Sequence, residues 1–114
     1  MSQIQRETFA IASSGTLSNA LGGNGKRLVA VYLPALDSTT VGFVADIDGG
    51  TTYDDIFTNS GAPAAVTLGT ANTGGYWQAV PEDVGRISAV VPIKLKVASQ
   101  TGGARSIISL WEAP

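Results

Sequence analysis

Short runs of alternating apolar and polar residues, each closed by residues that favour turns, make up most of this chain. The clearest run covers residues 41–48, in which every second residue from Val41 onward is apolar. Residues 91–97 repeat the pattern and place Lys94 and Lys96 on the opposite face. Because successive side chains of a strand point to opposite sides of a sheet, each run predicts a strand with one buried face.

The other runs are shorter or less regular. Helical patterning is nearly absent, because Gly, Pro, Thr or Asn interrupts the chain every few residues. Arg27–Leu33 is almost continuously apolar, which is typical of a strand buried on both faces. Pro92 has no amide hydrogen to donate and indicates a strand start or an edge strand. The predicted strands cover residues 3–12, 16–21, 27–33, 41–48, 51–57, 64–68, 76–80, 91–97 and 105–111.

Two turn signals separate neighbouring predicted strands. Asn24-Gly25 favours a tight hairpin, because both residue types tolerate positive φ angles. Asp48-Gly49-Gly50 predicts a second hairpin in the same way. The spacing of the runs predicts an all-β fold, a jelly-roll-like sandwich of two antiparallel sheets with about eight or nine strands. We interpret residues 1–114 as a single β-sandwich domain.

The first twelve residues fit this pattern poorly. In a regular strand Ile4 and Phe9 fall on opposite faces, whereas Phe9 and Ile11 share one. Residues 1–12 are therefore either an N-terminal arm that contacts another chain, with Ile4 and Phe9 as apolar anchors, or an ordinary first strand. The sequence leaves both alternatives open.

The composition excludes several classes of function. The chain has no cysteine, which excludes disulfides and thiolate metal sites, and no histidine, the commonest general base and metal ligand. A net charge of −2 gives no basic surface for nucleic acid. The low charged fraction, 14% beside 44% apolar residues, indicates a surface that a partner covers. With no targeting signal and no long apolar window, we expect a soluble protein made in the cytoplasm.

Acidic residues near one turn are the main candidates for a metal site. Asp46, Asp48 and Asp54 carry carboxylate oxygens of the kind that Ca²⁺ prefers, but their spacing differs from that of an EF-hand loop. A plain turn is the favoured interpretation, and no metal or other cofactor is expected. A glycosidase pair is not expected either, because Asp54 and Asp55 are adjacent and would point to opposite faces of a strand. We therefore expect no enzyme and no catalytic residues.

Adjacent aromatic residues indicate a contact surface. Tyr76 and Trp77 are neighbours, so in a strand one ring faces the core and the other faces outward. The outward ring is a candidate contact for protein or for sugar, and protein is favoured. Together with Ile4 and Phe9, these are the predicted interface residues.

Several segments in a fixed order carry a further signal. They are Leu28–Ala35, Val41–Phe43, Asp48–Asp55, Gly75–Tyr76, Pro81, Ile93–Val97 and Arg105–Leu110. In this pattern the chain, from about Gly15 onward, resembles the small all-β head-decoration and head-fibre-base proteins of tailed bacteriophages and gene-transfer particles. The resemblance implies a sandwich fold, a place on the capsid shell and, commonly, a trimer.

We accordingly expect a structural virion protein that decorates and stabilises, or cements, a bacteriophage capsid, or forms the base of a head fibre. Its expected partners are the major capsid protein, further copies of itself in a homotrimer and, in the second case, a head-fibre protein. Neither nucleic acid nor membrane is an expected partner. The expected location is the capsid surface of the virion. The alternative is a carbohydrate-binding module on a virion appendage or a secreted enzyme, which would show saturable glycan binding.

Overall fold

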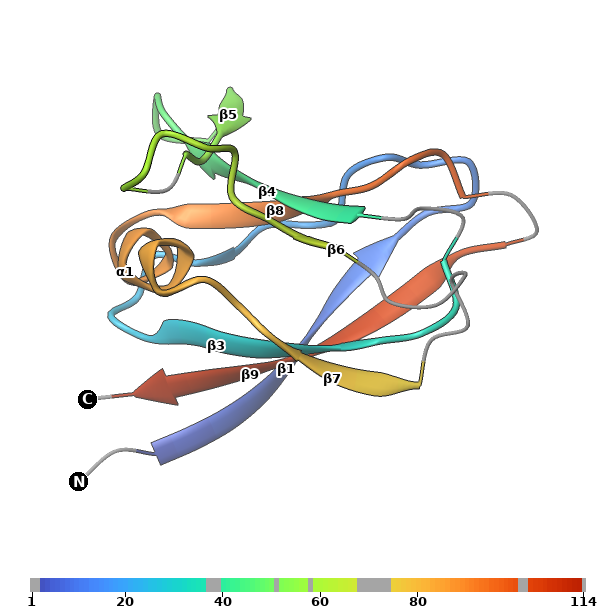
Figure 1. Ribbon diagram of the computed structural model, residues 1–114, viewed down its shortest axis with the longest axis horizontal. Helices are drawn as coiled ribbons and strands as arrows, with labels where there is room; N and C mark the ends of the chain where they lie inside the picture. Colours follow the sequence, from blue (N-terminus) through green and yellow to red (C-terminus); the bar gives the residue numbers. More distant parts are fainter. Residues whose placement is uncertain are drawn as a thin grey trace.

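Two antiparallel sheets pack face to face and enclose the hydrophobic core (Figure 1). The computed structural model describes residues 3–36, 40–50, 52–57, 59–67, 75–100 and 103–113. The strands are β1 (Gln3–Ile11), β2 (Leu21–Gly22), β3 (Arg27–Leu33), β4 (Thr40–Asp46), β5 (Tyr53–Asp55), β6 (Ala65–Thr67), β7 (Tyr76–Ala79), β8 (Pro92–Lys96) and β9 (Arg105–Ala113). The predicted all-β sandwich is confirmed. Met1, Ser2, Thr51 and Leu68, which belong to predicted segments, lie outside the described residues.

One sheet has four strands in the order β1-β9-β3-β7, and the other has five, in the order β2-β8-β4-β5 with β6 also paired to β4. Alternate residues of each long strand point into the space between the sheets. From β9 these include Ile107 and Trp111, and from β4 Val41 and Phe43, all of them buried. The predicted alternation of residues 41–48 is therefore found in β4, although Ile47, beyond the strand, is exposed.

A helix, α1 (Glu82–Val90), closes one end of the sandwich between the two sheets (Figure 1). The expectation that helical structure is nearly absent is wrong here. Pro81 occupies the N-cap position, and Val91, extended because Pro92 follows, ends the helix. Ser88 fixes α1 to β3, since its Oγ accepts the Leu28 N–H at 3.0 Å and donates to the Gly85 carbonyl at 2.8 Å.

Two expectations about the middle of the chain are also wrong. Residues 24–25 form no hairpin, because β2 and β3 belong to different sheets. The loop crosses between the sheets and is held by α1, with the Gly23 and Gly25 N–H groups donating to the Ser88 and Ala89 carbonyls. Strand β3 is not buried on both faces: a bulge at Val29 turns the apolar side chains of Leu28 and Val31 toward the same core.

Strand β1 is part of the sandwich and not a separate arm. It pairs with β9 in continuous register, from Gln3 opposite Ala113 to Ile11 opposite Arg105. Phe9 is fully buried against the ring of Trp111, with ring centroids 6.2 Å apart. The expectation that Phe9 anchors another chain is wrong, because the core of its own sandwich covers it. Ile4 remains 57% exposed.

In the part of the chain that the structure describes, no helix is long and apolar enough to cross a membrane.

Candidate functional site

The outer face of the four-stranded sheet, here called the outer face, carries exposed apolar side chains in rows that cross the strands. Cross-strand partners in register lie on the same face of an antiparallel sheet. One row runs across all four strands from Thr8 through Ile108 and Tyr32 to Trp77. The next row runs from Arg6 through Leu110 and Ala30 to Ala79.

Two aromatic rings dominate this face. Tyr32 and Trp77 stack edge to face, with ring centroids 5.2 Å apart and planes at 68°. Trp77 is 46% exposed and Ile108, beside Tyr32, is 39% exposed. Edge-to-face packing holds the indole in place while leaving it accessible to a partner. This is the arrangement expected of a preformed contact surface.

Charged residues lie at the margin of the outer face. Arg6 stands on the edge strand β1, and the Arg27–Glu112 ion pair, 3.9 Å long, closes one end. An apolar centre with a charged rim is the usual composition of a protein–protein interface. The outer face therefore offers binding area for a partner of this kind.

The four predicted interface residues fall into two pairs. Ile4 and Trp77 lie on the outer face, at its two edge strands. Phe9 and Tyr76 face inward, where Tyr76 packs against the core. Tyr32 was not among the predicted interface residues, although residues 105–111 carry a signal for this face. Ile108 and Leu110 alternate with Ile107 and Trp111, so apolar residues lie on both sides of β9: one side fills the core and the other remains for a partner.

The acidic residues proposed as calcium ligands organise a turn. Asp46 Oδ1 accepts the N–H groups of Asp48, Gly49 and Gly50 at 3.0, 3.0 and 2.9 Å. Asp48 Oδ1 accepts the N–H groups of Gly50 at 3.3 Å and Thr52 at 3.0 Å. Asp54 lies further along, on β5 opposite Ala45. Among the described residues no three acidic side chains gather as metal ligands do.

Replacing Asp46 by Ala should lower the free energy of unfolding by about 1 kcal/mol, because three turn N–H groups lose their acceptor but stay accessible to water. Replacing it by Asn should cost less, since the amide keeps an Oδ1 acceptor. Urea denaturation measures both changes. A melting temperature that rises with added CaCl₂ in the wild type, but not in Asp46→Asn, would contradict the turn role.

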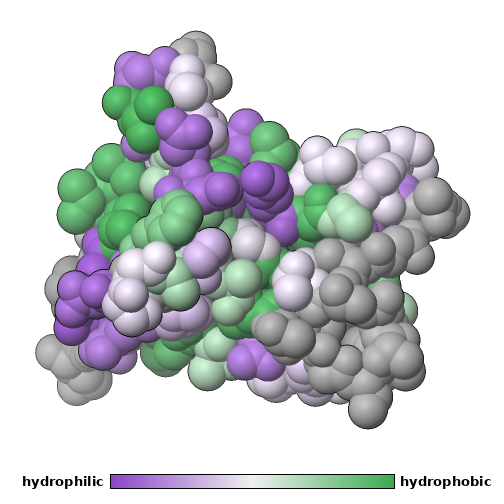
Figure 2. Space-filling view, turned by 45° about the horizontal axis from the view of Figure 1, so that its top comes forward, coloured by the Kyte–Doolittle hydropathy of each residue, from purple (hydrophilic) through white to green (hydrophobic). Residues whose placement is uncertain are grey.

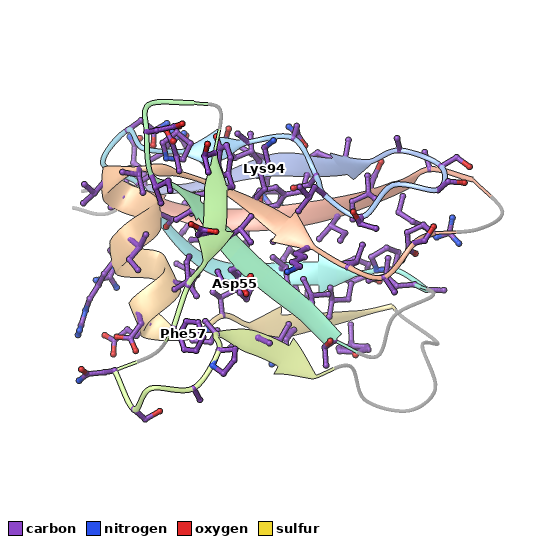
Figure 3. All side chains as sticks on the ribbon, turned by 90° about the horizontal axis from the view of Figure 1, so that it is seen from above. Asp55, Phe57 and Lys94 are labelled. Atoms are coloured by element: carbon purple, nitrogen blue, oxygen red, sulfur yellow. The ribbon has the colours of Figure 1, made fainter. Side chains whose placement is uncertain are left out.

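The outer side of the five-stranded sheet is a second polar surface that could form a binding site, and Figure 3 looks down on it. Lys94 Nζ lies 4.5 Å from the centroid of the Tyr53 ring, and Lys96 Nζ lies 3.3 Å from Asp55 Oδ1. Burial, followed by the charges of Asp46 and Asp48, raises the pKa of the Tyr53 hydroxyl above its ordinary value. A shallow pocket of about 230 Å³ adjoins these groups. Two of its charged side chains, Lys96 and Asp55, pair with each other, and Asp54 also lines it.

Apolar residues on the side seen in Figure 2 are interspersed with polar ones, and they are most prominent toward the end where α1 lies. Exposed apolar residues outside the outer face include Ile47, Phe57 and Val90. They come from the β4–β5 turn, the segment after β5 and the end of α1. Phe57 lies near α1 in Figure 3, beside an open groove of about 410 Å³ that also includes Arg86 and Ile87. None of these apolar residues belongs to a register-aligned row like those of the outer face.

Comparisons with known proteins identify a shared fold. The crystal structure of the SPBc2 prophage-derived protein YomS is similar to this chain, with a TM-score of 0.60 and 16% sequence identity. The similarity covers 99% of this chain and 96% of YomS. No family model and no curated protein sequence matches the chain. At this identity the likeness concerns the fold, which is shared over nearly the full length of both chains.

Proposed function

We propose that this chain is a structural protein of a phage particle, which decorates and stabilises the capsid or forms the base of a head fibre. In this role it binds the major capsid protein and catalyses no reaction. The observation that carries the proposal is the outer face, an exposed apolar surface that includes the packed Tyr32–Trp77 pair. The proposal is further supported by the full-length fold similarity to a prophage-derived protein.

The chemistry of the outer face suits a capsid partner better than a small ligand. An open sheet surface buries apolar area against another broad surface, whereas a small molecule binds in a concave site. Trp and Tyr are the side chains that most often dominate the energy of protein interfaces. Trp77 and Tyr32 are held together before binding, so little side-chain freedom is lost on association. Binding through this face requires no chemical step.

The test uses expanded capsids assembled without this protein, mixed with the purified chain and sedimented. Replacing Trp77 by Ala should weaken binding at least about 30-fold, the effect of losing an aromatic anchor that contributes about 2 kcal/mol to an interface. Phe57→Ala is the matched control, since this aromatic residue is 55% exposed outside the outer face. Its affinity should equal that of the wild type.

Loss of binding in Phe57→Ala together with full binding in Trp77→Ala would show that the capsid contact lies around Phe57 and not on the outer face. A chain that ignores capsids altogether would contradict the capsid role. Trp77 also has the exposure that sugar stacking needs, so the same proteins should be titrated with glycans. Saturable glycan binding that Trp77→Ala abolishes would instead favour a carbohydrate-binding module.

A further inference from the structure

Strand edges differ sharply in this sandwich. In the five-stranded sheet the edge strands β2, β5 and β6 have two, three and three residues, and in the four-stranded sheet β7 has four. Strand β1, the remaining edge, has nine residues and pairs with β9 without a bulge. Short, irregular or covered edges are how soluble proteins avoid pairing with other strands. Among the described strands, β1 is the long and regular edge, and it carries no proline.

The backbone groups on that edge can be assigned residue by residue. The N–H and C=O of Ala10 point away from β9, because they bond the Asn19 side chain at 2.7 Å and the Asn19 N–H at 3.2 Å. Alternate residues of a strand direct these groups to the same side. Ile4, Arg6 and Thr8 therefore also point their N–H and C=O groups outward. These outward groups have no partner among the residues that the structure describes.

An extended strand fits this edge, and β1 of a second copy fits it best. Antiparallel pairing with Ile4 opposite Thr8 uses all three outward residues of each copy, and it stops short of Ala10, where Asn19 occupies the edge. Each opposed pair then exchanges two hydrogen bonds, which gives six about a two-fold axis.

The charges on the core side of this edge match in the same register. Lys26 Nζ bonds Gln5 Oε1 at 2.7 Å and Glu7 Oε2 at 3.0 Å. Two-fold pairing brings Gln5 of one copy opposite Glu7 of the other. Lys26 then lies between a carboxylate of its own chain and one of the second copy, and oppositely charged groups alternate along the contact. On the outer face, Arg6 of one copy lies opposite Arg6 of the other, and this is the one repulsive pair in the contact.

We propose that the β1 edge is a self-association site, at which two copies join their four-stranded sheets through antiparallel β1–β1 pairing. The inference does not depend on the proposed function. The contact has two-fold symmetry, and it joins the two outer faces into one wider surface. The resulting dimer differs from the homotrimer that the sequence resemblance implies, and a measurement of the molecular mass in solution distinguishes the two.

Thr8→Pro is the deciding variant. Proline removes the Thr8 N–H, which points away from β9, so the change takes no hydrogen bond from the monomer. Thr8→Val is the matched control, because it keeps the N–H and a β-branched side chain. Sedimentation velocity across a concentration series should show a wild-type dimer, at least tenfold weaker association in Thr8→Pro, and little change in Thr8→Val. Arg6→Gln should tighten the dimer by removing the repulsive pair.

Circular dichroism shows whether Thr8→Pro folds. If it does not, a second measurement on the wild type tests the proposal. Amide hydrogen exchange of the wild type should slow at Ile4, Arg6 and Thr8 as the protein concentration rises. The amides of Gln5 and Glu7, which face β9, should be protected at every concentration. A wild-type monomer at the highest soluble concentration overturns the proposal. So does a trimer, or a dimer whose affinity Thr8→Pro leaves unchanged.

Discussion

Trp111→Ala should lower the free energy of unfolding by about 3–5 kcal/mol, a large share of the stability of a domain whose total is about 5–15 kcal/mol. Trp111 is fully buried, and its Nε1 donates a hydrogen bond to Ser109 Oγ at 2.7 Å. The ring packs against Phe9 and lies over Gly22, where a Cβ would come within 3.2 Å of it. Alanine would leave a cavity at the centre of the core and a hydroxyl without its donor.

Urea denaturation followed by circular dichroism measures this change without depending on the lost indole. Trp77→Ala is the matched control, because it removes the same side chain from the opposite face of the same sheet. With 46% of Trp77 already exposed, its loss should cost about 1 kcal/mol. Equal costs for the two tryptophans would contradict the assignment of one to the core and the other to the outer face.

Gly85→Ala should destabilise the protein by about 1–3 kcal/mol, although the same change in an open helix would stabilise it by about 0.5–1 kcal/mol. A Cβ at Gly85 would lie 2.8 Å from the carbonyl oxygen of Leu28, which belongs to the backbone of β3. Because that backbone cannot move alone, α1 would have to shift away from the sheet. The shift would also stretch the hydrogen bond between Ser88 Oγ and the Leu28 N–H.

The melting temperature of Gly85→Ala, compared with that of the wild type, shows directly whether the substitution destabilises or stabilises the protein. Val90→Ala is the control on the same helix: Val90 is 75% exposed, and alanine has the higher helix propensity. It should leave the melting temperature unchanged or raise it slightly. A higher melting temperature for Gly85→Ala would show that α1 is not held as closely to β3 as the contact requires.

The strands were predictable where apolar residues recur at every second position. Every second residue of β4 from Val41 is buried, so the pattern in residues 41–48 gave both the strand and its core face. Strand β3 was harder to interpret, because the bulge at Val29 breaks the alternation and makes residues 27–33 appear buried on both sides. A sequence pattern with period two cannot show such a bulge.

The other errors arose where tertiary contacts decide the structure. Gly25 does adopt a positive φ of 87°, as the turn signal predicts, but which strands pair depends on the whole fold and not on the turn. Helix α1 was missed because nine residues containing Gly85 give a weak helical signal. Its flanking prolines, Pro81 and Pro92, mark both ends in retrospect. Of the candidate site, Trp77 was predicted, whereas Tyr32 comes to lie beside it only through the pairing of β3 with β7.

The pairing of β1 with β9 also determines how the molecule bears mechanical load. Gln3 lies opposite Ala113, so both ends of the described chain emerge at the same end of one strand pair (Figure 1). A force that pulls the two ends apart acts parallel to the hydrogen bonds between β1 and β9, which then break one after another from that end. A force directed across the sheet faces is shared by the whole core. Tension applied between Gln3 and Ala113 should therefore open β1 from β9 before it loads the rest of the core.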